Sequence, residues 1–503
     1  LETAAGKIAV KTGKQSEIKN FAPSDNTERV LHDLKKVGLS DKDILIDPET
    51  NKPFKNPIMN GVSHILKLEH KVDHKFSTRY RDGHDSNEQA ITGGISGGKN
   101  LGRMEVSALL ARGATENLKE MYNIKGQKNN EYWKALETGS MLPPPAPSFV
   151  WNKQLAMMKG AGINVIQKGK QLNLKPLTDE EVKELSNGKL ENPTDTYRKK
   201  DLAPIKGGLF DPVKAGGMQG EHYTHFELPE KILNPITATA AATMLDMPLD
   251  NLESIINGKS FVDKDSGKIV KPGTPNSFSG GPAVEKLLSQ INVNKELEKL
   301  QSDATVITNK TQLNKVHRKL RYLKALKENK MQPTDYMIKN VLVVPSKYRP
   351  MFTMGTDNTV IMSDVNDLYQ QTAYTADALK DLKTTLDETI KDDDIKHVQL
   401  AESRGQLYQD VKALSGLREP TAYLHRIKDK KGFIAQIDGG KKQTKEGFFQ
   451  DKVLERRQDL VGRSTIILNP ELGGDQLGIP KLMANKIFQP FIMKKLVSWG
   501  YSP

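Results

Sequence analysis

Residues 456–464 read RRQDLVGRS and lie within a longer segment, 449–492, of sequence FQDKVLERRQDLVGRSTIILNPELGGDQLGIPKLMANKIFQPFI. Arg457 and Arg463 are six residues apart around a glycine, and each guanidinium group can make a bidentate contact to a phosphate. Asp459, between them, is suited to orient one of the two arginines. Residues 418–463 contain twelve Lys or Arg against seven Asp or Glu. Such a run is usually a solvated charged loop, and a phosphate-binding site is the alternative.

A second segment, residues 93–109, reads GGISGGKNLGRMEVSAL. Its first seven residues fit the start of a P-loop, but position 100 is Asn, where a P-loop needs the Ser or Thr hydroxyl that binds Mg²⁺. We therefore do not assign nucleotide hydrolysis to these glycines. Glycine lets a backbone approach nucleic acid closely, and Lys99 supplies a positive charge for a phosphate.

The composition fits a large protein with an anionic partner. The chain has 503 residues, enough for several modules, and 75 Lys or Arg against 62 Asp or Glu give a net charge of +13. A solvated basic surface is the alternative explanation of that charge. The absence of cysteine excludes disulfides and Cys-ligated zinc or iron–sulfur sites. No run of about 18 apolar residues occurs, so we expect no membrane-spanning helix.

Two histidine pairs have spacings that occur in metal sites. His70 and His74 are four residues apart, and His222 and His225 are three apart. Neither pair has an obvious third ligand nearby. We therefore expect surface or hydrogen-bonded histidines and assign no metal site.

Local patterns predict the modules of the chain. The sequence MLPPPAP at 141–147 predicts an extended linker, and the polar residues 167–200 are the best candidate for a boundary between two halves. Apolar spacing at 56–80 predicts a helix or a buried strand, and residues 365–414 predict an antiparallel helical pair. Residues 313–323 predict a helix whose other face carries Lys315, Arg318, Lys319, Arg321 and Lys324.

The segments quoted above resemble two different subunits of the multisubunit, DNA-dependent RNA polymerases. Residues 56–121, with GGK at 97–99 and GRMEVSAL at 102–109, resemble the C-terminal end of the β subunit. Residues 449–492 resemble the N-terminal part of β′, and GGLFD at 207–211 is similar to the opening of β′. The resemblance covers about residues 50–503 and places parts of both subunits in one chain, as in the split polymerases of giant bacteriophages.

The resemblance implies a multi-module α+β fold with the end of a double-psi barrel, a β–β′ anchor and a clamp base that carries a helical coiled-coil hairpin. The expected modules are the barrel end at 1–80, the β-type C-terminal switch, anchor and clamp region at 81–170, a β′-type N-terminal clamp base without a zinc ribbon at 171–290, a basic helix and lid at 291–362, the clamp coiled coil at 363–416, and the rudder, switch and start of the β′ active-site module at 417–503.

The resemblance also implies where nucleic acid binds. GKIAVKTGK at 6–14 is similar to the β motif with two active-centre lysines, so Lys7 and Lys14 are candidate catalytic contacts to phosphate. A lysine-rich, flexible N-terminus is the alternative. The candidate DNA- or RNA-binding residues are Lys75, Arg79, Lys99, Arg103, Arg456, Arg457, Asp459 and Arg463. Among these, Asp459 orients an arginine, and the others are the candidate contacts.

The implied function is that of a DNA-directed RNA polymerase subunit, a nucleotidyltransferase that is incomplete alone. The Asp-x-Asp-x-Asp motif of β′ is absent from the sequence, so we expect Mg²⁺ on a partner subunit, and we expect no zinc. Expected partners are chains with the β N-terminal and β′ C-terminal parts, template DNA, nascent RNA and an initiation factor, but no membrane. The phage resemblance predicts a location in the cytoplasm of the infected host or in the virion. The competing hypothesis is a non-catalytic nucleic-acid-binding or virion structural protein.

Overall fold

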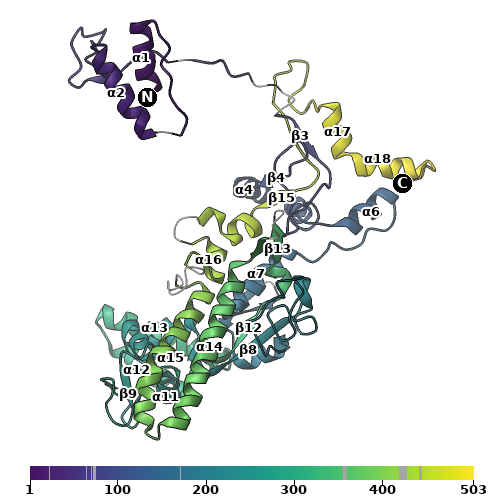
Figure 1. The fold of residues 1–503 in the computed structure, drawn as a ribbon. Coiled ribbons are helices and arrows are strands. Elements are labelled where there is room, and N and C mark those ends of the chain that lie inside the picture. The colour runs from purple at the N-terminus through teal and green to yellow at the C-terminus, as the bar shows by residue number, and fades with distance from the viewer. Residues whose placement is uncertain are drawn as a thin grey trace. The chain divides into compact units, whose positions relative to one another are not determined.

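The computed structural model of the protein divides the chain into two compact units (Figure 1). The first unit comprises Leu1–Phe76 and Ser464–Ile467, and the second comprises Ser77–Arg463 and Leu468–Pro503. The structure describes residues 1–21, 23–63, 65–69, 71, 75–169, 171–354, 359–418, 428–440 and 444–502. In the described residues, no helix is long and apolar enough to span a membrane.

The first unit is a helical pair with a small core. α1 (Glu2–Thr12) ends at Gly13, whose positive φ of 67° brings its N–H to the carbonyl of Ala9. α2 (Pro23–Lys36) follows, and the strands β1 (Lys42–Asp43) and β2 (Ile58–Met59) pair antiparallel. The apolar cluster between the two helices consists of Ala4, Ala5, Ile8, Val30 and Leu34.

The apolar run at 56–80 does not form the predicted helix or buried strand over most of its length. Ile65, Leu66 and Leu68 are 91%, 82% and 75% exposed, and Val72 lies outside the described residues. Charged residues alternate with these apolar ones, and the described part of this unit supplies no core to cover them. A buried strand occurs only at the end of the run, at 77–79. The double-psi barrel therefore stays a prediction, since the described residues of the first unit form two helices and one short ladder.

The second unit contains two short ladders that join distant parts of the chain. β4 (Lys99–Leu101) pairs antiparallel with β15 (Arg456–Gln458). β3 (Ser77–Arg79) pairs antiparallel with β16 (Val461–Arg463). The helices of the same segments are α4 (Arg103–Ala111), α5 (Thr115–Glu120), α6 (Asn130–Thr138), α17 (Lys481–Ile487) and α18 (Gln489–Ser498).

The main core of the second unit contains residues from both sides of the predicted boundary at 167–200. α7 (Phe149–Gly160) contributes Met157, and a sheet of strand order β12-β8-β7 contributes Phe226 and Val341 to one apolar cluster. Residues 167–200 therefore lie within one compact unit and do not divide it. The elements here are β5 (Ile163–Lys168), β6 (Gln171–Pro176), α8 (Asp179–Leu185), β7 (Ser186–Lys189), β8 (Tyr223–Leu233) and β12 (Met337–Val343).

A second apolar cluster includes α13 (Lys310–Glu328), the helix predicted from residues 313–323. It buries Leu323 and Leu326, as the apolar stripe requires. Lys319 does not lie on the exposed basic face, because it is buried in ion pairs with Asp246 and Glu296. The neighbouring elements are α9 (Ala238–Met244), α10 (Leu249–Ile256), β9 (Phe261–Asp263), β10 (Ile269–Val270), β11 (Ser277–Phe278), α11 (Gly281–Ser289) and α12 (Val293–Val306).

The predicted antiparallel pair at 365–414 is present as α14 (Asp364–Thr389) and α15 (Asp393–Ser415), the two long green helices of Figure 1. Arg349 lies at the base of α14, and the antiparallel strands β13 (Met351–Met354) and β14 (Thr359–Met362) come between the two in the chain. Its guanidinium donates to the Asn366 side chain and the Val344 carbonyl, each at 2.8 Å. Burial lowers the pKa of Arg349 to about 10. A short helix, α16 (Phe433–Asp438), packs on α7.

Candidate nucleic-acid interface

The arginine-rich segment 456–463 is held by both ladders of the second unit. In the first ladder Arg457 lies opposite Asn100, and in the second Arg463 lies opposite Ser77. Residues 459 and 460 join the two strands, and Leu460 adopts a positive φ of 51° at this corner. The sequence motif is therefore a bent β segment fixed along both halves by strands from residues 77–101.

Glycine makes this close strand pairing possible. A Cβ on Gly98 would lie 2.6 Å from the Ala90 Cβ and 3.3 Å from the Gln458 carbonyl oxygen. A Cβ on Gly462 would lie 2.8 Å from the side chain of Met483 in α17. The contacts at 2.6 and 2.8 Å are too short for a larger residue without movement of its neighbours. Gly98 thus lets the backbone just before β4 lie against β15, a role that differs from phosphate binding.

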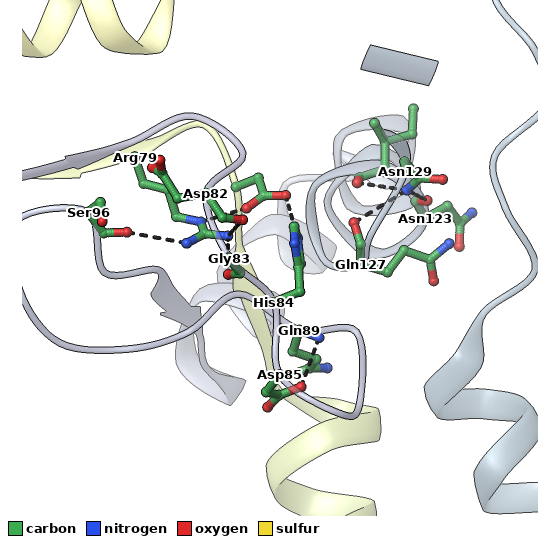
Figure 2. Close-up of polar contacts among 12 residues, drawn as sticks. Arg79, Asp82, Gly83, His84, Asp85, Gln89, Ser96, Asn123, Gln127 and Asn129 are labelled. Carbon is green, nitrogen blue, oxygen red and sulfur yellow. Dashed lines mark hydrogen bonds and ion pairs between the residues drawn. The ribbon is translucent and has the colours of Figure 1, made fainter. Parts of the chain in front are cut away.

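Asp459 is the buried centre of the corner. Its side chain is 0% exposed, and its Oδ1 accepts from Arg79 Nε at 2.6 Å, while His84 Nε2 lies 3.0 Å from its Oδ2. Figure 2 shows the Arg79 guanidinium directed toward the backbone of Asp82, Gly83 and Ser96, whose carbonyls accept at 2.8, 2.9 and 3.3 Å.

These contacts correct two sequence-based interpretations. Asp459 orients Arg79 and His84 and makes no contact with Arg457 or Arg463 in the described structure. Arg79, which was a candidate nucleic-acid contact, is only 1% exposed and has its guanidinium nitrogens occupied by protein oxygens. It therefore positions the corner instead of facing a phosphate. Sequence spacing missed this pair because its members are 380 residues apart.

The loop between α5 and α6, which begins with the π-helix η1 (Met121–Lys125), also supports the corner. The Asp459 N–H donates to the Lys125 carbonyl at 2.7 Å. The Asn129 side chain holds this loop by donating to the carbonyls of Asn123 and Ile124, each at 2.9 Å, as Figure 2 shows for Asn123. Hydrogen bonds therefore hold both the backbone and the side chain of Asp459.

Arg456 and Arg457 point to opposite faces of their strand. Arg456 is buried, lies over the Tyr122 ring at 5.4 Å and donates to Ser148 Oγ at 3.2 Å. Burial lowers its pKa to about 10. Arg457 is partly exposed, and its Nη1 lies 3.4 Å from Asp85 Oδ2. Of the two, only Arg457 has a side chain that an incoming phosphate can reach, so Arg456 is not placed to bind nucleic acid as predicted.

Three further predicted cations accompany Arg457. Arg463 and Arg103 are exposed, and Lys99 is partly exposed. Within the described residues none of the three forms an ion pair. In the β4–β15 ladder, Lys99 pairs with Gln458, and Leu101 pairs with Arg456. Arg103 is the first residue of α4. The four cations therefore lie on or next to the two ladders, with Lys99 on the Arg456 face of the β4–β15 ladder and Arg457 on its other face.

Three predicted lysines belong to the first unit. Lys7 is engaged in an ion pair with Asp43, and its Nζ also donates to the Ser40 carbonyl at 2.8 Å. Lys14, just beyond α1, and Lys75 are exposed. Among the described residues of this unit, none of these three lysines forms a hydrogen bond or ion pair with another residue of the predicted site.

Of the two histidine pairs, only His222 and His225 lie in the described part of the chain. His70 and His74 lie outside the described residues. His225 Nδ1 lies 2.7 Å from Ser186 Oγ, which fits a hydrogen-bonded histidine, and burial lowers its pKa. The described residues contain no group of three or more His, Cys, Asp or Glu that could hold a metal ion.

Comparison with known proteins addresses the family. Residues 1–96 match the family model described as RNA polymerase Rpb2, domain 6. Over 278 residues the chain is 30% identical to the DNA-directed RNA polymerase subunit beta' of Acinetobacter baylyi and 29% identical to that of Acinetobacter baumannii. The two findings support a subunit of a multisubunit RNA polymerase.

The matches are partial in extent. Each beta' match covers 51% of this chain and 19% of the relative, so the chain spans about a fifth of the length of the curated relatives. The Rpb2 match begins at residue 1 and so includes residues 1–49, which lie before the main resemblance seen in the sequence. It covers the segment 6–14 with Lys7 and Lys14.

Proposed function

We propose that this chain is a DNA-directed RNA polymerase subunit that joins a β-type C-terminal part to a β′-type N-terminal part and grips template DNA and the RNA–DNA hybrid. The observation that carries the proposal is the pairing of residues 456–463 with residues 77–101. Segments that resemble two subunits are hydrogen-bonded as one β structure, with the buried Arg79–Asp459 ion pair between them.

The roles of the side chains follow from their exposure. Arg457 and Arg463 bind phosphates of the template strand, and Lys99 and Arg103 add positive charge next to the same ladders. Arg457 leaves Asp85 when phosphate arrives, since a partly exposed ion pair at 3.4 Å is weak. Arg79 and Asp459 hold the corner that orients them. We further propose that Lys7, Lys14 and Lys75 contact nucleic acid from the first unit.

The remaining chemistry belongs to partner chains. We propose that Mg²⁺ is bound by a chain with the β′ C-terminal part, that another chain supplies the β N-terminal part, and that no zinc is required. When bound, Mg²⁺ stabilises the charge that develops during nucleotidyl transfer. α14 and α15 are the proposed clamp coiled coil and the surface for an initiation factor. We also propose that the enzyme is a split polymerase of a giant bacteriophage and acts in the infected host cytoplasm or is packaged in the virion.

The decisive experiment measures RNA synthesis by the assembled complex. The chain is co-purified with its partner chains and assayed for Mg²⁺-dependent synthesis on a DNA template that contains an open bubble. Arg457→Ala with Arg463→Ala should assemble normally and lose most of the activity, because two template contacts are removed. Lys199→Ala with Lys206→Ala, two exposed lysines elsewhere, is the matched control and should stay active.

Two outcomes would contradict the proposal. Full activity of the Arg457 and Arg463 double variant would remove the template-gripping role. A chain that binds DNA with strong salt dependence, without preference for a bubble and without RNA synthesis in any assembly, would instead support the non-catalytic or virion structural alternative.

A further inference from the structure

Asp85 supplies the carboxylate that Arg457 contacts. Arg457 Nη1 lies 3.4 Å from Asp85 Oδ2, and the two side chains are 24% and 26% exposed. The pair Arg79–Asp459 differs in both respects, since its atoms are 2.6 Å apart and its side chains are 1% and 0% exposed. Of these two Arg–Asp pairs, only the Asp85–Arg457 pair is therefore open to exchange with an ion from solvent.

The two carboxylate oxygens of Asp85 have different partners. Its Oδ1 accepts from the backbone N–H groups of Asn87 at 2.8 Å and of Gln89 at 3.1 Å, and Figure 2 shows the second of these bonds. The Asp85 N–H donates to the Gln89 carbonyl at 2.8 Å, which closes the turn. The turn thus fixes the carboxylate through Oδ1, and Oδ2 is the oxygen that faces Arg457.

Two further contacts give this turn, and with it Asp85, a fixed position. The side chain of Gln89 is buried, and its Nε2 donates to the Lys452 carbonyl at 3.1 Å. Lys153 Nζ, from α7, donates to Asn87 Oδ1 at 2.9 Å. The arginine is therefore the member of the pair that can move, because its long side chain has several rotatable bonds.

The turn does not account for the charge of Asp85. Asn and Ser side chains also accept from backbone N–H groups in turns of this kind, so a neutral residue would hold the same backbone. The negative charge acts on Arg457 instead. An incoming phosphate must replace Oδ2 at the guanidinium, and the fixed carboxylate then stays close to the bound phosphate and repels it.

We propose that Asp85 is an intramolecular competitor of nucleic-acid phosphate for Arg457, a positioning residue that keeps this contact weak enough to exchange. The competition rests on the template-binding role proposed above for Arg457. When one phosphate leaves, Arg457 returns to Asp85 and stays directed until the next phosphate arrives. Such an exchange suits a protein along which a nucleic-acid strand moves, because a second partner for the arginine lowers the cost of releasing each phosphate.

The test measures binding of the full chain to a fluorescein-labelled DNA duplex with an open bubble. Fluorescence anisotropy is recorded at low ionic strength, where ion pairs are least screened. Asp85→Asn keeps an acceptor for the turn and should bind about two- to fivefold more tightly, the range for a partly exposed ion pair. Structural damage would weaken binding, so a gain identifies competition. Asp85→Ser should show the same gain, and thermal unfolding shows which variants are folded.

Two controls separate the local contact from net charge. Asp201→Asn removes the carboxylate of another Arg–Asp pair, Arg198–Asp201 at 2.7 Å, changes the net charge equally and should leave binding unchanged. Asp85→Asn should have no effect in an Arg457→Ala background, because the arginine for which it competes is absent. An equal gain in Asp201→Asn, or a gain that persists without Arg457, would overturn the competition, since net charge alone would explain it.

The remaining outcomes distinguish this inference from the proposed function. Unchanged or weaker binding by the folded Asp85→Asn and Asp85→Ser variants, with weaker binding by Arg457→Ala, would overturn the competition alone. Arg457→Ala that binds the bubble DNA as tightly as the natural protein would remove the template-binding role of Arg457, and the competition with it.

Discussion

At the scale of single residues, the buried Arg79–Asp459 pair controls the geometry of the corner between β15 and β16. Both side chains are almost fully removed from solvent. Removal of one partner leaves an uncompensated buried charge, which typically costs about 3–5 kcal/mol. We therefore expect Asp459→Leu or Arg79→Met to lower the free energy of unfolding of the purified chain by roughly that amount, measured by denaturant titration.

A double-mutant cycle identifies the source of that cost. Arg79→Met combined with Asp459→Leu removes both charges, so its stability should recover toward that of the natural protein. Arg81→Met is a suitable control because Arg81 is about a third exposed and pairs with a different carboxylate, Glu137. A double variant that is as unstable as the sum of the single ones would show that the two residues act independently.

The same residues show what the sequence could predict of the site. The motif at 456–463 indicated a charged functional segment, and the structure keeps Arg457 and Arg463 accessible on it. The alternation of a strand turns Arg456 inward, and this direction follows only once the pairing with β4 is known. Asp85 and His84, which contact Arg457 and Asp459, carry no motif of their own. No local signal pointed to them.

At the scale of elements, α15 is tied to the central sheet by a buried polar contact. Arg404 makes a two-pronged ion pair with Glu230 of β8, at 2.6 and 2.9 Å, and its Nη1 donates to His397 Nδ1 at 3.0 Å. Burial, together with the positive charge of Arg404, lowers the pKa of His397 from 6.5 to about 4. The ring must be neutral to accept this hydrogen bond.

This contact predicts a pH dependence with a definite sign. Between about pH 6.5 and 4 the unfolded chain binds a proton at His397 that the folded chain does not bind, so stability should fall as the pH falls through that window. His397→Gln should show a smaller decrease in Tm between pH 7 and 5 than the natural protein. His317→Gln, an exposed histidine on α13, should behave like the natural protein. Equal slopes in all three would contradict the assignment.

Elements differ in how well the sequence predicted them. The pair α14 and α15 was predicted because an apolar stripe repeats at the helical period from Val365 to Ile390, and a second helical segment follows the acidic residues 392–394. β3, β4, β15 and β16 are three residues each, too short for a periodic pattern. Their existence depends on partners far along the chain. The run around Ile65–Leu68 has an apolar pattern that predicted a helix or a buried strand, but its side chains are exposed because no described core covers them.

At the scale of the whole molecule, the second unit predicts that the β5–β6 turn is dispensable once the chain has folded. Met157, before the turn, shares a core with Phe226 and Val341, and the ladders join both ends of the unit again. A specific protease site inserted after Gly169 should therefore give two fragments that co-elute after cleavage in native buffer. They should separate in denaturant.

The control for this experiment is a variant in which one substitution weakens the β3–β16 ladder. After the same cleavage in a chain with Gly462→Val, which crowds Met483, the fragments should separate at a lower denaturant concentration. Fragments of the unaltered sequence that separate at once in native buffer would contradict the shared core.

The continuous chain through β5 and β6 has a kinetic consequence. If the two halves were separate polypeptides, each would have to find the other by diffusion, at a rate set by how many copies the cell contains. Tethered by a single hairpin, they meet in a first-order step, with an effective concentration set by the linker and not by expression level. The halves are therefore always produced in equal number, and dilution cannot part them. Association of the two halves is therefore not a separate bimolecular step in any assembly that contains this chain.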